Sequence, residues 1–400
     1  MHYIALPLLN ESHNIPSLLT CLKQQEYKDF VLIVCVNNYD DWWGKEDKRL
    51  QCEDNQKSIE LLEAEIELDI IIIDKSSKGK AWPPKKGGVG RARKTAMDHI
   101  ALKGRNEDII VSIDADTYYP PNYLAEIELN LKDKKYIGLA LPYYHKTTGE
   151  NDKLILRYEI YMRYFLLNLM RINNPFAYTA LGSAMAFPLW AYKKVGGLTP
   201  VMSGEDFYFL QKLSKSGQLA VWADTIAYPS SRFSDRVNFG TGPALIKGHT
   251  GDWDSYPIYD HHHFDLVKTT YNMFPSLYVN DESTPMNKFL EKQFATSNLW
   301  APLRNNYKDE ANFIKACINK VDGLRILQFL KSKNPEIHNS SRYLIDYLLE
   351  YSIIGKEDEI YKVLNDFSFD QSSVNEMKVI RDYLFQKEMG VRRIKEFLKK

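Results

Sequence analysis

Two carboxylates directly follow an apolar run in the first third of the chain. The run covers residues 108–113 and predicts a buried strand, with Asp114 and Asp116 just past its carboxyl end. An open α/β sheet usually gathers its ligands at that edge. Carboxylates two residues apart can hold a hard divalent cation there, and such a cation can bind a diphosphate. An acidic pair at a strand end also forms ordinary solvated turns, so the rest of the sequence has to favour one interpretation.

A second acidic pair, Glu205 and Asp206, opens the amphipathic helix predicted over residues 207–214. Acidic side chains at a helix amino terminus interact favourably with the helix dipole, so capping alone explains this pair. A functional interpretation of the pair needs further features.

The stretch from residue 75 to 105 is the most basic part of the chain. A Gly88-Val89-Gly90 turn within it precedes a predicted helix whose free amides favour anions. Arg93 is fixed at the start of this helix, whereas the lysines before the turn are equally well explained as a solvated loop. The stretch is therefore a candidate site for phosphate groups.

A further metal ligand could come from a histidine. His249 lies between two glycines and close to a lysine, and the run His261-His262-His263 offers other candidates. Imidazole suits Mn2+ better than Mg2+. A single histidine is more often structural than a ligand, and we place His249 ahead of the other three as a partner of Asp116.

The order of the predicted elements implies a mainly parallel sheet. Strands are predicted at residues 3–9, 30–36, 70–73, 108–113 and 136–141, and helices at 15–25, 56–66, 91–102 and 121–133. This alternation is typical of right-handed β-α-β units. The carboxyl ends of the strands, and the polar residues that follow them, are therefore expected at one edge of the sheet.

The later part of the sequence is helical. Residues 154–172 predict a long, largely buried helix that carries too many charges for a membrane span. From about residue 280 onward the pattern consists of helical periods with little strand signal. We therefore expect a first domain at residues 1–279 and a smaller all-helical domain at residues 280–400. Partner binding, membrane docking and covering of the first domain all remain open as roles for the second.

Composition narrows the class of protein. Lysine plus arginine and aspartate plus glutamate number 52 each in 400 residues, so no global field favours nucleic acid or an acidic membrane. The four cysteines lack metal-ligand spacing and are expected as free thiols in a reducing compartment. No export signal is visible at the amino terminus. We expect a soluble cytoplasmic protein that binds no nucleic acid, with peripheral contact to the inner face of the membrane left open.

Seven short motifs follow one another in a fixed order. They are Asn10-Glu11, Asn37-Asn38, Gly88-Val89-Gly90-Arg91-Ala92-Arg93, Ile113-Asp114-Ala115-Asp116, Gly182-Ser183-Ala184, Val195-Gly196-Gly197 and Gly204-Glu205-Asp206. In this order they resemble a family-2 glycosyltransferase with the GT-A fold. The resemblance implies an α/β nucleotide-sugar-binding domain with a mainly parallel sheet flanked by helices, followed here by the smaller helical domain.

The resemblance also implies roles for single residues. The implied donor-binding residues are Asn10, Glu11, Asn37, Arg93 and Asp114; the implied metal ligand is Asp116; the implied base that faces the acceptor is Asp206, beside Glu205. An arginine after the last strand-like segment, Arg232 or Arg236, would help to stabilise the leaving diphosphate, and Arg236 is our donor-binding candidate. Two features depart from the family pattern. The second strand ends in Asn37-Asn38 instead of acidic residues, and the loop at residues 74–87 is longer and more basic than is typical.

These features predict transfer of a sugar from a UDP- or GDP-linked donor to a hydroxyl of a glycan or lipid-linked saccharide, with Mn2+ or Mg2+ as cofactor. Asp206 would take the proton of the hydroxyl, and Glu205 would raise its basicity. Attack from the face opposite the leaving diphosphate predicts inversion at the anomeric carbon.

Two alternatives stay open, and the oligomeric state is not predicted. A sugar-nucleotide nucleotidyltransferase would normally open on a basic glycine-rich loop after the first strand, which Asn10-Glu11 does not provide. A catalytically silent sugar-nucleotide binder, with a helical region that recruits partners, is disfavoured by the intact acidic pairs.

Overall fold

The computed structural model describes residues 1–132, 135–147, 149, 151–233, 240–333 and 339–397. The chain forms two compact units. Unit 1 comprises Met1–Ile155, Tyr178–Thr250 and Met389–Lys400, and unit 2 comprises Leu156–Ala177 and Gly251–Glu388. This division differs from the boundary predicted between residues 279 and 280. Helical periodicity predicts a helix but not its neighbours, and the long helices α5 (Asp152–Arg171) and α17 (Val374–Phe397) each contribute residues to both units. A separate domain from residue 280 stays a proposal.

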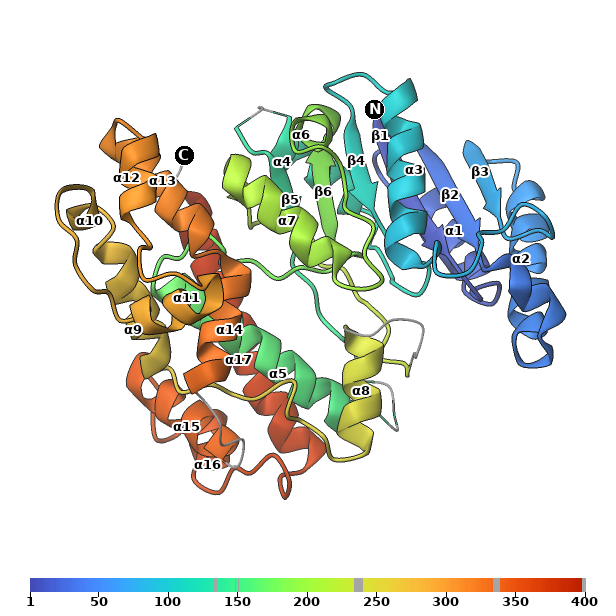
Figure 1. Ribbon diagram of the computed structural model, residues 1–400. Helices are drawn as coiled ribbons and strands as arrows, with labels where there is room; N and C mark the ends of the chain where they lie inside the picture. Colours follow the sequence, from blue (N-terminus) through green and yellow to red (C-terminus); the bar gives the residue numbers. More distant parts are fainter. Residues whose placement is uncertain (133–134, 148, 150, 234–239, 334–338, 398–400) are drawn as a thin grey trace. The chain divides into compact units, whose positions relative to one another are not determined.

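Unit 1 is built on a seven-stranded sheet with the order β3-β2-β1-β4-β6-β5-β7 (Figure 1). The strands are β1 (His2–Leu8), β2 (Phe30–Asn37), β3 (Ile70–Lys75), β4 (Ile109–Ser112), β5 (Gly138–Ala140), β6 (Met185–Pro188) and β7 (Leu219–Ala220). Strand β6 runs antiparallel to β4 and β5, and the other pairs are parallel. Together with the flanking helices and the helical later part of the chain, this confirms the predicted α/β class with a mainly parallel sheet.

Helices cover both faces of this sheet. The helices of unit 1 other than α5 and α17 are α1 (Ile15–Lys23), α2 (Glu46–Glu63), α3 (Val89–Lys103), α4 (Tyr123–Leu131), α6 (Leu189–Lys194), α7 (Glu205–Ser216) and α8 (Thr241–His249), with a 3-10 turn η1 (Asp40–Gly44). Apolar side chains of α1 and α4 pack with alternate residues of β1, β2 and β4 in one continuous core. Helix α3 packs on β1 and β2 and lies in front of the strands in Figure 1, with α1 behind them.

Two details of this unit differ from the prediction. Helix α2 begins at Glu46, ten residues before the predicted start at residue 56, because residues 46–55 are mostly charged and polar and give only a weak helical pattern. Strand β6 is not among the predicted strands. Four apolar residues cannot by themselves distinguish a strand from the start of a buried helix, nor give its direction.

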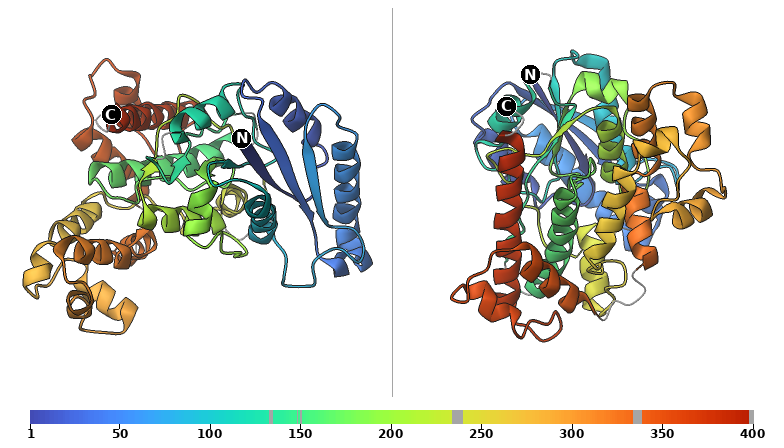
Figure 2. Two further views of the ribbon diagram at one scale, coloured as in Figure 1. Left: turned by 90° about the horizontal axis from the view of Figure 1, so that it is seen from above. Right: turned by 90° about the vertical axis from the view of Figure 1, so that its left-hand side faces the viewer.

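Among the described residues of unit 2, the regular elements are all helices. Besides parts of α5 and α17 it contains α9 (His262–Asn272), α10 (Ser276–Val279), α11 (Asn287–Phe294), α12 (Ala301–Asn306), α13 (Glu310–Lys320), α14 (Gly323–Lys333), α15 (Ser340–Tyr351) and α16 (Glu359–Leu364), seen again in the two views of Figure 2. Among the described residues, no helix combines the length and the apolar character that crossing a membrane requires.

Two of the charges in α5, Glu159 and Arg163, are buried in unit 2 together with two charges of α17. Arg163 pairs with Glu159 at 2.6 Å and with Glu388 at 2.5 Å, and Arg381 pairs with Glu159 at 3.3 Å. All four side chains are fully buried. Two acidic and two basic groups compensate one another, which is the condition under which charges are found in a protein interior.

Candidate active site

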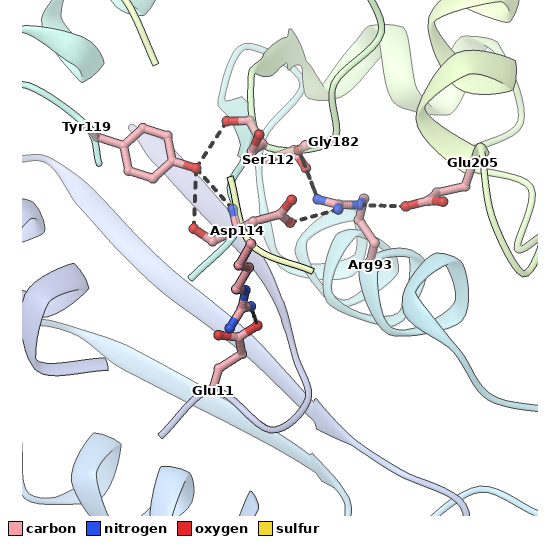
Figure 3. Close-up of polar contacts among 9 residues, drawn as sticks. Glu11, Arg93, Ser112, Asp114, Tyr119, Gly182 and Glu205 are labelled. Atoms are coloured by element: carbon pink, nitrogen blue, oxygen red, sulfur yellow. Dashed lines mark hydrogen bonds and ion pairs between the residues drawn. The ribbon is translucent and has the colours of Figure 1, made fainter. Parts of the chain in front are cut away.

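The predicted polar motifs meet at the carboxyl ends of the central strands. Glu11 follows β1, Asp114 follows β4, and Glu205 opens α7, and Figure 3 shows these side chains with the arginine that lies between two of them. The expected clustering at one sheet edge is thus observed in unit 1. The contacts described below determine what each side chain can do.

Arg93 from the first turns of α3 is the centre of the cluster. Only 2% of the Arg93 side chain is exposed. Its guanidinium donates from Nη2 to Oδ1 of Asp114 at 2.9 Å and from Nε to Oε1 of Glu205 at 3.1 Å. It also donates from Nη1 to Oγ of Ser112 at 2.5 Å and to the carbonyl of Gly182 at 2.9 Å. One arginine therefore joins the end of β4 to the start of α7.

Two glycines of the predicted motifs make room for this arrangement. A Cβ atom on Gly90 would lie 2.3 Å from the carbonyl oxygen of Val201, so α3 could not approach the segment before α7. A Cβ atom on Gly182 would lie 2.5 Å from Nη2 of Arg93. Such distances are well inside van der Waals contact, and both positions require glycine for packing.

The charges of the cluster stabilise one another. Burial by itself lowers the pKa of Arg93, but the nearby carboxylates of Asp114 and Glu205 outweigh it and raise the pKa above the ordinary value. Arg93 is therefore a permanent cation. The four bonds that its guanidinium donates all end on protein acceptors, so in this structure Arg93 positions Asp114 and Glu205. Its predicted contact with a nucleotide stays a prediction.

The main chain of Asp114 is fixed by Tyr119. The Tyr119 hydroxyl accepts a hydrogen bond from the Asp114 amide at 3.0 Å and donates to the carbonyl of Ser183 at 3.1 Å. Burial raises the pKa of Tyr119, so the hydroxyl keeps its proton. The Asp114 side chain itself remains 37% exposed, and a ligand can reach it.

Asp116 is paired with an arginine. Its Oδ2 lies 2.9 Å from Nε of Arg232, and the same guanidinium donates from Nη2 to Oε1 of Glu11. Sequence reasoning placed Arg232 near the leaving group but did not predict that it bridges these two acids. The donor-binding candidate Arg236 lies outside the described residues.

In this structure Asp114, Asp116 and His249 do not form a binding site for a metal ion. Oxygen ligands such as Asp116 suit Mg2+ and Mn2+, but here the Asp116 carboxylate is paired with a cationic side chain. His249 is the exposed last residue of α8, and its ring edge packs against Phe233 at 5.5 Å. It does not gather with Asp114 and Asp116 into a three-ligand group. Its assignment to a metal stays a prediction.

A different cluster has the composition of a metal site. Among the described residues, the group of three potential ligands that lie close enough together is Asp260, His261 and His262 in unit 2. The His261 and His262 rings lie 4.1 Å apart, and His261 pairs with Glu350 at 2.8 Å. These contacts account for the cluster as a carboxylate-histidine network between α9 and α15.

The asparagines at the ends of β1 and β2 hold the two strand ends together. Asn37 is buried and donates from Nδ2 to the carbonyl of Leu8 at 2.8 Å. Asn10 has a φ of +54° and donates its amide proton to Asn55 at 2.9 Å. Asn55, which sequence reasoning missed, is fully buried on α2. The donor-binding roles of Asn10 and Asn37 stay predictions, and their observed contacts shape the edge.

Asp206 has the electrostatic character of a general base. It is half-buried in the first turn of α7, where its Oδ1 accepts a hydrogen bond from the Phe207 amide at 2.7 Å. Burial and the adjacent Glu205 raise the pKa of Asp206 to about 7, against the opposing effect of Arg93. A carboxylate with a pKa near the working pH can accept a proton during a reaction and release it afterwards.

The chain matches no protein family model, and it matches no curated protein. Several solved structures have a similar chain course. S. aureus TarS 1-349 in complex with UDP-GlcNAc is 13% identical, with 96% of this chain and 92% of that chain covered and a TM-score of 0.40. The mannosyltransferase PcManGT from Pyrobaculum calidifontis in complex with GDP-Man and Mn2+ is 15% identical, with 80% and 86% covered and a TM-score of 0.42. Likenesses at this level assign no activity to this chain.

Proposed function

We propose that this chain is a glycosyltransferase that moves a sugar from a nucleotide-diphosphate donor to a hydroxyl of a glycan or lipid-linked saccharide. The observation that carries the proposal is that one arginine forms ion pairs with both acidic motifs, Asp114-Ala115-Asp116 and Glu205-Asp206. The buried Arg93 binds Asp114, at the end of β4, and Glu205, at the start of α7. Asp114, whose side chain is exposed at the strand end, and Glu205, the neighbour of Asp206 in sequence, thus share one cation, which supports the proposal.

Each carboxylate has a distinct role in this proposal. Asp114, exposed at the strand end, contacts the ribose or the sugar of the donor. Asp206 accepts the proton of the attacking hydroxyl as the new glycosidic bond forms and the bond to the diphosphate breaks. Glu205 is held by Arg93 and acts on Asp206 through its charge. The acceptor attacks from the face opposite the diphosphate, so the product has inverted configuration at the anomeric carbon.

The leaving diphosphate needs positive charge beside it. Arg232 is the cation that the described residues place against Asp116, and we infer that it stabilises the leaving group. Binding of Mn2+ or Mg2+ at Asp116, which the sequence predicted, requires that Arg232 is displaced. No step of the mechanism proposed here passes through a metal.

Donor turnover and donor binding together test this proposal. The full chain is incubated with a panel of UDP- and GDP-linked sugars, and release of the nucleoside diphosphate is measured. We expect one donor to be turned over by the wild type and by Asp47→Asn, a control acid in the first turn of α2. Asp206→Asn should bind that donor with unchanged affinity but not turn it over. Equal turnover by Asp206→Asn would contradict the role of Asp206.

A further inference from the structure

Unit 1 contains a cavity of about 410 Å3 beside the candidate active site. The cavity opens between the turn after β2, the basic loop before α3 and the segment before α7. It is lined by Tyr39, Asp41, Trp42, Lys45, Pro84, Lys85 and Met202, so its side chains carry one acidic and two basic groups. None of these residues has a role in the function proposed above.

The basic loop before α3 forms one side of this cavity and is held in place by hydrogen bonds and packing. Trp82 of the loop is buried, and it donates its amide proton to the carbonyl of Asn38 at 3.1 Å. The amide of Asp40 in turn donates to the carbonyl of Trp82 at 2.8 Å. A Cβ atom on Gly87 would lie 2.8 Å from the Tyr39 ring, so glycine allows the loop to close against that ring. These contacts fix the main chain of the loop at Trp82 and Gly87, while its lysines Lys78, Lys80, Lys85 and Lys86 are exposed to solvent, as the sequence interpretation of a solvated loop allowed.

The lining combines aromatic rings with positive charge. The Tyr39 and Trp42 rings pack edge to face with centroids 5.3 Å apart. Lys45 pairs with Asp41 at 2.6 Å, whereas Lys85 forms no ion pair with any of the described residues. Lys85 also has a φ of +65°, a left-handed conformation that is uncommon for a lysine and is often found at functional sites. Aromatic rings contact the apolar faces of sugars, and an uncompensated ammonium group binds an anion.

The cavity borders the segment that leads into α7, the helix whose first turn contains Asp206. A Cβ atom on Gly88 would lie 3.5 Å from the sulfur of Met202, and Gly90 packs on Val201. The glycine turn thus runs from the cavity wall to the segment before α7. Asp206 lies four positions after Met202, and an extended chain spans at most about 14 Å over four positions. A short oligosaccharide can bridge this distance.

We propose that this cavity is a subsite for an anionic sugar residue of the acceptor, a residue that carries a phosphate or a carboxylate group. The sugar ring packs on Tyr39 and Trp42, and its anionic group binds Lys85. The assignment of this subsite to the acceptor rests on the proposed function, whereas the subsite itself is defined by the cavity. The sugar residue bound in the subsite belongs to the same saccharide whose hydroxyl group reaches Asp206.

Binding of a small sugar phosphate tests the subsite without any transfer activity. Tryptophan fluorescence of the full chain is titrated with glucose 6-phosphate, and with methyl glucoside and inorganic phosphate for comparison. We expect saturable binding of glucose 6-phosphate that is at least about tenfold tighter than that of either comparison compound, because only glucose 6-phosphate engages both the rings and Lys85. Trp42→Ala should abolish the binding, and Lys85→Met should weaken it by at least about tenfold.

Lys78→Met is the matched control, because Lys78 is an exposed lysine of the same loop outside the cavity lining. Equal binding by Lys85→Met and Lys78→Met would overturn the proposal, and so would inorganic phosphate binding as tightly as the sugar phosphate. Displacement of glucose 6-phosphate by UDP in the Asp206→Asn variant would assign the cavity to the donor base and overturn the acceptor assignment. Binding of glucose 6-phosphate by a chain that turns over no donor would refute the proposed function and leave the subsite standing.

Discussion

Replacing Arg93 with methionine should destabilise unit 1 strongly. The substitution keeps most of the length of the buried side chain but removes every donor of the guanidinium. Asp114 and Glu205 lose their cationic partner, and the carbonyl of Gly182 loses a hydrogen bond. Removing one partner of a buried ion pair costs roughly 3–5 kcal/mol, because an uncompensated charge stays behind. We expect a loss of that size in the free energy of unfolding of unit 1 at pH 8.

The loss should be smaller at low pH. Arg93 holds down the pKa of Asp206, which burial and Glu205 raise, so the Arg93→Met variant has an Asp206 with a still higher pKa. The folded variant then keeps a proton that the unfolded chain has already released. Raising the pH through this interval therefore favours unfolding, and lowering it relieves the charge repulsion. At pH 5 Asp206 is protonated in the folded variant, and the destabilisation decreases.

Hydrogen exchange of α3 and β4 measures this effect in unit 1 itself, since exchange reports the opening of single elements. Arg49→Met is the matched control. Arg49 pairs with Glu53 on the exposed surface of α2, and losing such a pair changes stability by less than about 1 kcal/mol. Equal protection in Arg93→Met and Arg49→Met, or a larger loss at pH 5 than at pH 8, would refute the assignment of Arg93 as the charge centre.

Three further predictions follow from the contacts. The kcat/KM of donor turnover should rise with pH through about 7 as Asp206 loses its proton, and a pH-independent rate between pH 5 and 9 would contradict this role. Arg232→Met should bind Mn2+ about tenfold more tightly than the wild type, measured by electron paramagnetic resonance of free Mn2+, because Asp116 loses one cation that competes with the metal ion. Weaker Mn2+ binding by the variant would contradict this prediction. Arg163→Met should destabilise unit 2 by about 3–5 kcal/mol in urea, whereas the exposed-pair control Arg342→Met should cost less than about 1 kcal/mol.

Much of the fold of unit 1 could be predicted because its elements have strong local patterns. Strands β1, β2 and β4 are short runs of apolar residues, and α3 opens after a glycine turn. The direction of β6 could not be predicted, since strand pairing depends on segments far away in the sequence. The division into two units could not be predicted for the same reason. The division depends on whether the residues of α5 and α17 pack in unit 1 or in unit 2.

The candidate site was predicted as a set of residues but not as a set of contacts. Asp114 and Glu205 were identified from their positions after a strand and at a helix start. For Arg93 the family resemblance implied a nucleotide contact, which stays a prediction. Its contacts with Asp114 and Glu205 were not predicted, because local sequence does not show which groups a long side chain reaches. The pairing of Arg232 with Asp116 joins residues more than a hundred positions apart, and no local pattern reports it.

We propose that the sheet edge containing Asp114 and Asp206 turns over a nucleotide-diphosphate sugar. The most direct test measures nucleoside diphosphate release from UDP- and GDP-linked sugars by the wild-type chain, with donor binding measured by calorimetry on the same samples. We predict that at least one donor is bound and turned over by the wild type, and that Asp206→Asn binds it without turnover. Absence of binding and turnover for every donor, with the folded protein confirmed by hydrogen exchange, would contradict the assignment.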